Sequence, residues 1–193
     1  MNRDVVIVGG GNAALCAALA AREAGARVAL LEKATRPERG GNSFFTAGAF
    51  RFAHQGLEDL RKDVLPDLSD AEVRAIEIDP YPESQFFDDL ARLTEHLTDP
   101  DLAETLVRGS RPSIVWMRSQ GVRFIPMFAR QAFRIGDRHR FWGGLSVEAV
   151  GGGPGLIEAL YARAEQLGVE IRYGVKASRL LLDQRGAVRG LVT

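Results

Sequence analysis

The sequence is poor in cysteine and lacks long apolar runs. Its 193 residues include one cysteine, Cys16, so no disulfide can form within the chain, which fits a reducing compartment. No uninterrupted apolar run approaches the roughly 20 residues that span a bilayer. Asp4 and the glycines at 9–11 interrupt the apolar N-terminus, unlike the continuous core of a secretory signal. We therefore expect a cytoplasmic protein that does not insert into a membrane.

The sequence also lacks a surplus of either charge. Basic and acidic residues number 25 each, so no basic excess points to nucleic acid and no acidic tail points to disorder. Hydrophobic residues make up 46% of the chain, as is ordinary for a globular protein. This length predicts one domain with a sizeable core and room for a small inserted lobe.

What the sequence does contain is a βαβ pattern at its start. Residues 5–8 form a β-branched run that is typical of a buried parallel strand. Glycines follow, and the alanine- and leucine-rich residues 13–24 favour a helix that ends at Gly25. A second apolar run at 27–31 then leads to Glu32. Strand, glycine turn, helix and strand within about 30 residues predict a dinucleotide-binding unit.

The remainder divides into an irregular, a helical and a mixed part. Residues 33–56 read as loop, and 122–153 as loop with short strands. Between them, helices are predicted at 71–78, 83–94, 101–109 and 113–120, with prolines near their starts. Apolar spacing predicts a helix at 154–167, and strands are expected at 169–173, 177–182 and 187–192.

The predicted fold is α/β, with a parallel sheet, a helical insertion and an antiparallel β-meander near the C-terminus. We divide it into a βαβ unit with a flavin loop (1–56), the helical insertion (57–120) and a continuation of the first domain (121–193).

The first chemical motif is Gly9-x-Gly11-x-x-Ala14. Gly9 permits a tight turn, Gly11 lets a pyrophosphate approach the backbone, and Ala14 allows close helix–strand packing. Glu32 stands 21 residues after Gly11, where a carboxylate can accept a ribose hydroxyl. The alternative is a glycine-rich turn in another kind of α/β domain, but the surrounding pattern favours the dinucleotide site.

A second glycine-rich segment, residues 39–43, is followed by Ala47 and Gly48. Backbone amides at such glycines can form an anion-binding nest, and Ser43 can donate a hydrogen bond. Taken alone, the segment reads slightly better as a flexible surface loop.

These motifs, together with the glycines at 151–153 and the helix after them, resemble the succinate dehydrogenase/fumarate reductase flavoprotein family. Residues 9–19, 39–43, His54 and 161–171 are similar to the tricarballylate dehydrogenases of that family. The same N-terminal part also resembles the flavoprotein part of an oxygen-independent precorrin-3B synthase, so that enzyme stays as an alternative.

The resemblance implies FAD as the cofactor and assigns residues to it. Those expected at the diphosphate, the adenosine or the flavin ring are Gly9, Gly11, Asn12, Ala13, Ala14, Glu32, Lys33, Gly40, Gly41, Asn42, Ser43, Ala47, Gly48 and, at adenine, Ala177. Some members attach FAD through a histidine that corresponds to Asn42. Asn42 cannot form that bond, so the resemblance implies non-covalent FAD.

The implied activity is the oxidation of a small polycarboxylate, from tricarballylate to cis-aconitate, with electrons passing to a separate acceptor protein. The family's catalytic arginine and histidines correspond to positions beyond Thr193. We therefore expect an N-terminal, catalytically incomplete part of a dehydrogenase and assign no catalytic residue. A fragment that binds FAD without turnover is a second hypothesis. A nicotinamide-dependent dehydrogenase is a third, and it gives no task to residues 40–43 and 151–153.

The three histidines are weaker candidates. His54 could contact substrate or flavin, although a surface loop histidine is the favoured interpretation. His96 is expected to be structural. His139 lies among Arg134, Arg138 and Arg140, a cluster that could attract a polycarboxylate, with solvated surface charge as the default.

Two further residue types are assigned to packing. Cys16 is expected to be a small buried hydrophobe in the first helix. The phenylalanines at 44, 45, 50 and 52 are expected to pack in the core or in a flavin pocket.

Overall fold

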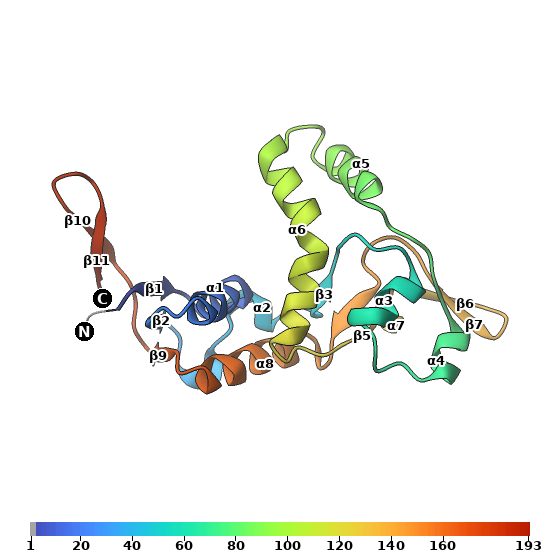
Figure 1. The fold of residues 1–193 in the computed structure, drawn as a ribbon, viewed down its shortest axis with the longest axis horizontal. Coiled ribbons are helices and arrows are strands. Elements are labelled where there is room, and N and C mark those ends of the chain that lie inside the picture. Colours follow the sequence, from blue (N-terminus) through green and yellow to red (C-terminus); the bar gives the residue numbers. More distant parts are fainter. Residues whose placement is uncertain (1–2) are drawn as a thin grey trace. The chain divides into compact units, whose positions relative to one another are not determined.

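The computed structural model describes residues 3–193 and confirms the predicted α/β class (Figure 1). The chain forms two compact units. Unit 1 comprises Met1–Thr46 and Gly153–Thr193, and unit 2 comprises Ala47–Gly152. The boundaries expected from the sequence were at 56 and 120. The difference arises because residues 47–56 and 121–152 share a sheet, in which β3 (Ala49–Phe50) and β5 (Phe124–Pro126) both pair with β8 (Val147–Ala149).

Unit 1 is built on the predicted βαβ unit. A three-stranded parallel sheet has the order β1-β2-β9, with Val5 opposite Val28 and Ala29 opposite Glu170. The elements of this unit are β1 (Val5–Val8), α1 (Asn12–Glu23), β2 (Val28–Glu32), the 3-10 helix η1 (Arg36–Glu38), α2 (Gly41–Phe44), α8 (Gly152–Gln166, whose first residue belongs to unit 2), β9 (Glu170–Tyr173), β10 (Arg179–Leu182) and β11 (Val188–Val192). Every residue of the central strand β2 is buried.

Two expectations for unit 1 change. The strand β1 was expected to be buried on both faces, but its burial alternates: Val6 and Val8, on one face, are exposed, and the other two residues are partly buried. The C-terminal antiparallel part consists of β10 and β11 alone, which form the hairpin that follows β9 in Figure 1. The strand β9 instead joins the parallel sheet beside β2.

Unit 2 combines helices with two small sheets. Its sheets have the orders β3-β8-β5 and β4-β7-β6. Besides β3, β5 and β8, its elements are α3 (Leu57–Asp63), α4 (Asp70–Ala75), β4 (Ile76–Ile78), α5 (Glu83–Leu93), α6 (Pro100–Ser119), α7 (Phe128–Gln131), β6 (Ala132–Ile135) and β7 (Arg138–Phe141). The buried side chains of Tyr81, Phe86 and Val107 form a core cluster that includes residues of α5 and α6.

The predicted helices of this unit need two corrections. Residues 76–78 form a strand, not the end of a helix, because Ile76 and Ile78 are buried in parallel pairing with His139 and Phe141. The helices predicted on either side of Pro112 are one continuous helix, α6. Proline removes one backbone hydrogen bond there, and the Ser113 hydroxyl donates to the Gly109 carbonyl at 2.7 Å on the same stretch.

Candidate functional site

A pocket of about 350 Å³ opens in unit 1 at the carboxyl ends of β1 and β2. In parallel α/β sheets, ligands bind at this edge. Four separate parts of the sequence supply the lining, which consists of Val8, Gly9, Gly10, Gly11, Leu31, Glu32, Lys33, Gly41, Val175, Lys176 and Ala177.

The turn between β1 and α1 leaves its backbone open to this pocket. Gly9 has a φ of +103°, and its N–H donates to the Leu31 carbonyl at 2.8 Å. A Cβ built on Gly9 would meet no atom within 4 Å, so glycine here serves the backbone conformation and keeps space free. Helix α1 begins after Gly11, which has no side chain that could cap it. Its first-turn amides and the positive end of its dipole suit a phosphate group.

The second glycine-rich segment lies directly against this turn. The Ser43 hydroxyl, on α2, accepts a hydrogen bond from the Asn12 N–H at 3.1 Å. Since a hydroxyl both donates and accepts, the proton of Ser43 stays available to an anion. The two glycine motifs, 31 residues apart at this bond, therefore form one site.

The start of α8 supports the same segment by a close backbone approach. The Gly153 N–H donates to the Thr46 carbonyl at 3.0 Å. A Cβ on Gly153 would come within 2.6 Å of the Phe44 carbonyl oxygen, so a larger residue does not fit. Arg39 adds a second tie, since its guanidinium lies 4.7 Å from the centre of the Tyr161 ring and pairs with Glu158 at 2.6 Å. The predicted helix after the glycines thus holds the α2 segment in place.

Glu32 is fixed at the end of β2. Its side chain is buried, and its Oε1 accepts a hydrogen bond from the Ala34 N–H at 2.8 Å. The Glu32 carbonyl accepts from the Val175 N–H at 3.0 Å. This pairing brings residues 175–177 to the pocket, which explains why Ala177 lies in the same lining as Glu32.

The structure thus brings together part of the residue set assigned from the sequence. Lining the pocket are Gly9, Gly11, Glu32, Lys33, Gly41 and Ala177. Asn12, Ala13 and Ala14 form the start of α1, and Gly40, Asn42 and Ser43 lie in or next to α2. Ala47 and Gly48 belong to unit 2. An open glycine turn, a helix start with glycine at its N-cap and a fixed carboxylate fit a dinucleotide such as FAD, while the individual roles stay predictions.

Sequence reasoning missed Gly10, Val175, Lys176 and the support behind the turn. A Cβ on Gly10 would lie 2.7 Å from Glu32 Oε2 and would collide with the Tyr161 hydroxyl. That hydroxyl is buried and has no hydrogen-bond partner within residues 3–193. Burial raises the pKa of Tyr161 well above its usual range, and Tyr173 and Glu32 add to the shift. The only signal in the sequence was the position of Gly10 between two motif glycines.

His54 is not a surface residue, so the favoured interpretation from the sequence is wrong. Its side chain is 1% exposed in unit 2. The Gly56 N–H donates to its Nδ1 at 3.2 Å, which leaves Nε2 to donate to the Ser146 hydroxyl at 3.2 Å. Burial lowers the pKa of His54 to about 4, so the ring is neutral near pH 7. These contacts indicate a structural role for His54 in unit 2.

The other histidines and the arginine cluster lie at the surface or in strands. His96 is exposed after α5, with a φ of 60°. His139 lies in β7, with its ring 5.3 Å from that of Phe128. The arginines beside His139 each face a carboxylate, in the pairs Arg134–Asp137, Arg138–Glu77 and Arg140–Asp79. This arrangement agrees with the default of solvated surface charge.

Cys16 and the phenylalanines differ in how deeply their side chains are buried. Cys16 is half-buried, and burial raises the pKa of its thiol to about 11, which keeps it protonated. Phe52 is fully buried, as expected for a core residue. Phe45 is 84% exposed, so the core expectation is wrong there and only the flavin-packing alternative stays a prediction.

Within residues 3–193, no helix is long and apolar enough to cross a membrane.

Comparison with known proteins supports FAD as the cofactor. A family model described as an FAD binding domain matches residues 4–193. Over 189 residues the chain is 28% identical to a fumarate reductase (cytochrome) of Shewanella frigidimarina, covering 98% of this chain and 29% of that protein. Over 195 residues it is 31% identical to a urocanate reductase of Eggerthella lenta, covering 97% of this chain and 27% of that protein. The chain thus spans less than a third of the length of these relatives.

Solved structures agree on the fold. The open conformation of a flavocytochrome c3 fumarate reductase superimposes with a TM-score of 0.68 at 26% identity, covering 98% of this chain and 29% of that one. A 3-ketosteroid-Δ4-(5α)-dehydrogenase from Rhodococcus jostii gives a TM-score of 0.71 at 21% identity, covering 98% of this chain and 41% of that one, and supports the fold alone. With the family model covering almost the whole chain, this protein belongs to the FAD-binding domain family of the succinate dehydrogenase/fumarate reductase flavoproteins.

Proposed function

We propose that the chain is the FAD-binding part of a flavin-dependent dehydrogenase that acts on a carbon–carbon bond next to a carboxylate. The observation that carries this proposal is the hydrogen bond from the Asn12 N–H to the Ser43 hydroxyl. It joins a dinucleotide turn to the additional glycine segment, which a nicotinamide site does not require.

The roles of the residues follow from their positions. The open turn at Gly9 and the first amides of α1 bind the diphosphate, with the Ser43 hydroxyl as a further donor. The Glu32 carboxylate, oriented by the Ala34 N–H, accepts a ribose hydroxyl. When bound, FAD supplies the two-electron redox chemistry, and this part of the protein binds and orients it.

Titration with FAD tests the binding role, with flavin fluorescence as the readout. The informative variant is Gly9→Ala, with Gly25→Ala as its matched control. Both glycines belong to unit 1, have positive φ and have free space around an added methyl group, but only Gly9 lines the pocket. Both substitutions strain the backbone, and only Gly9→Ala also adds a methyl group to the lining of the pocket. We expect FAD affinity to fall at least roughly tenfold in Gly9→Ala, about the loss of one charge-assisted hydrogen bond. An equal loss in Gly25→Ala would contradict the assigned site.

We infer tricarballylate as the substrate and cis-aconitate as the product, with a separate protein as electron acceptor and a cytoplasmic location. The names of two relatives support the bond type, since fumarate and urocanate both carry a carboxylate conjugated to a carbon–carbon double bond. Oxidation of tricarballylate creates the same kind of bond. The precorrin-3B synthase alternative stays a prediction.

Anaerobic addition of tricarballylate tests the substrate, on the FAD-loaded form of the whole dehydrogenase of which this chain is proposed to be the FAD-binding part. Bleaching of the flavin absorbance with formation of cis-aconitate is the result expected for the dehydrogenase. If only another carboxylate bleached the flavin, that compound would take the place of tricarballylate as the proposed substrate. FAD binding without bleaching by any carboxylate would favour the second hypothesis, an FAD-binding fragment without turnover.

A further inference from the structure

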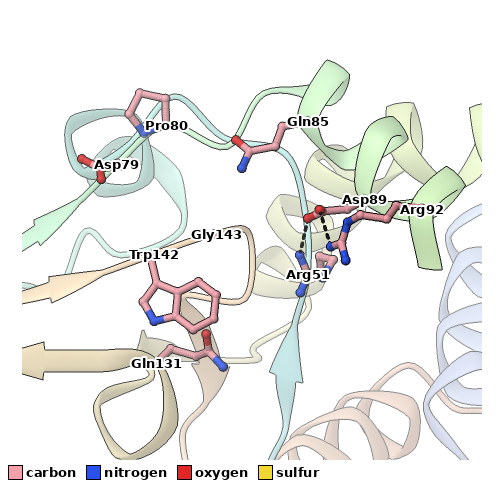
Figure 2. Close-up of a pocket in the computed structure, with 9 residues that line it drawn as sticks. All are labelled: Arg51, Asp79, Pro80, Gln85, Asp89, Arg92, Gln131, Trp142 and Gly143. Carbon is pink, nitrogen blue, oxygen red and sulfur yellow. Dashed lines mark hydrogen bonds and ion pairs between the residues drawn. The ribbon is translucent and has the colours of Figure 1, made fainter.

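Unit 2 contains a second pocket, of about 470 Å³, with a mixed charged and aromatic lining (Figure 2). The lining residues are Arg51, Asp79, Pro80, Gln85, Asp89, Arg92, Gln131, Trp142 and Gly143. None of them belongs to the residues assigned to FAD. Figure 2 shows Trp142 and Gln131 on one side and Arg51, Asp89 and Arg92 on the other.

The guanidinium of Arg51 is held in place by Tyr81 and Asp89. Its Nη1 donates to the Tyr81 hydroxyl at 2.9 Å and lies 3.3 Å from Asp89. Its guanidinium is 5.5 Å from the centre of the Tyr81 ring, and Tyr81 is fully buried. Within residues 3–193, Nε and Nη2 of Arg51 make no hydrogen bond. A fixed guanidinium with free donors is suited to binding a carboxylate.

Asp89 and Arg92 complete this side of the pocket. Both belong to α5, where a spacing of three residues places them on one face, and they pair at 3.0 Å. Hydrogen bonds from Arg92 and from the Tyr81 hydroxyl hold the pKa of Asp89 below its usual range, so the carboxylate is ionised. One carboxylate between two guanidinium groups leaves one positive charge uncompensated. Asp79, farther along the lining, is already paired with Arg140 at 2.7 Å.

Trp142 gives the opposite side a flat apolar surface. Its side chain is 60% exposed, although it is one of the largest apolar groups in the chain. An indole with a free face can stack on a planar ring and also contact its edge. The Gln131 amide lies on the same side and offers both a donor and an acceptor (Figure 2).

We propose that this pocket binds a small aromatic carboxylate, with one planar ring against Trp142 and one negative charge at Arg51 and Arg92. The uncompensated charge selects a monoanion, and the separation of the two sides into aromatic and cationic surfaces selects a ligand with the same division. Binding here does not require the FAD site.

The test uses the whole 193-residue chain and three probes of similar size. Benzoate has both features, cyclohexanecarboxylate keeps the charge without the flat ring, and benzamide keeps the ring without the charge. Each is titrated while the indole N–H resonances are followed by NMR. The chain has two tryptophans, so Trp116 provides an internal reference for Trp142. We expect saturable shifts of the Trp142 resonance with benzoate, at a Kd on the order of 1 mM for so small a ligand. The other two probes should bind at least roughly tenfold more weakly.

Matched variants test the residues. Arg92→Gln should weaken benzoate binding about tenfold, whereas Arg108→Gln should leave it unchanged. Arg108 is a fair control because it too is an exposed helix arginine, paired with Glu104 on its own helix. Trp142→Leu should also weaken binding, measured by calorimetry, with the exposed Phe133→Leu as its control. These four side chains are largely exposed, so the variants should fold, which circular dichroism checks.

Three outcomes would overturn the proposal. They are the absence of a saturable Trp142 shift with benzoate, equal binding of benzoate and cyclohexanecarboxylate, and equal losses in Arg92→Gln and Arg108→Gln. FAD affinity measured on the same samples reports unit 1 separately, so failure of this pocket is distinguishable from failure of the FAD site.

Discussion

Replacing Gly10 by alanine tests whether the dinucleotide turn is supported from behind by Tyr161. Gly10 has no positive φ, so alanine does not strain the backbone there. The added methyl would instead collide with the Tyr161 hydroxyl and lie 3.2 Å from Tyr161 Cζ and 2.7 Å from Glu32 Oε2. Tyr161 is 1% exposed on α8 and cannot move aside freely. Overpacking of this kind costs about 1–3 kcal/mol in the free energy of unfolding, and we expect the upper half of that range.

The double variant separates this contact from other effects. Tyr161→Phe removes a buried hydroxyl that has no partner within residues 3–193, so alone it should be neutral or stabilise by up to about 1 kcal/mol. In Gly10→Ala/Tyr161→Phe the worst collision is absent, while the contacts with the ring and with Glu32 remain. We therefore expect partial rescue, with a coupling of about 1 kcal/mol or more.

The assay has to resolve the two units. Hydrogen exchange of the β2 amides reports the opening of unit 1, because β2 is the central strand of its sheet. Trp116 and Trp142 both belong to unit 2, so tryptophan fluorescence during urea unfolding serves as the control and should not change. Unchanged exchange in Gly10→Ala, or strictly additive effects in the double variant, would refute the reasoning.

Three further predictions concern Ser43, Asn42 and His54. Ser43→Ala removes the bond to the Asn12 N–H, so FAD should bind about five- to tenfold more weakly by fluorescence titration, with no such loss in the exposed Ser119→Ala. Because Asn42 cannot form a histidyl bond to FAD, acid precipitation of the loaded protein should leave all flavin in the supernatant. Burial lowers the pKa of His54 from its ordinary 6.5 to about 4 in the folded chain, so the unfolded state takes up a proton first as the pH falls. Unit 2 should therefore lose up to about 3 kcal/mol between pH 6.5 and 4, and the pH dependence of urea unfolding should flatten in a His54→Gln variant.

The parts of the fold that the sequence predicted are those with local signals. The βαβ unit needed only a β-branched run, a glycine turn, an alanine-rich helix and a second apolar run, all within 32 residues. The helix α8 likewise follows from its apolar spacing after the glycines at 151–153. In both cases the periodicity of one short segment decides the element.

The wrong predictions concern residues whose structure is determined by a partner distant in the sequence. Ile76 and Ile78 are equally compatible with a helix and a strand, and the pairing with β7, more than 60 residues away, makes them a strand. His54 appeared exposed because it follows a glycine- and arginine-rich loop. It is buried by Ser146, 92 residues later, and by pairing with Tyr81. No local pattern contains these contacts.

The candidate site combines residues that local sequence signals predict with residues that contacts distant in the sequence bring into place. The sequence supplies the groups that meet the ligand, because turn and helix-start chemistry depends on a few neighbouring residues such as Gly9 and Gly11. What holds these groups is contributed later in the chain: Tyr161 lies behind Gly10, and residues 175–177 are carried to the pocket by the bond from Val175 to Glu32. The N-terminal βαβ unit alone would therefore present the motif without its supports. For this reason a change in α8, distant in sequence from every motif residue, should alter the dinucleotide site as directly as a change in the motif itself.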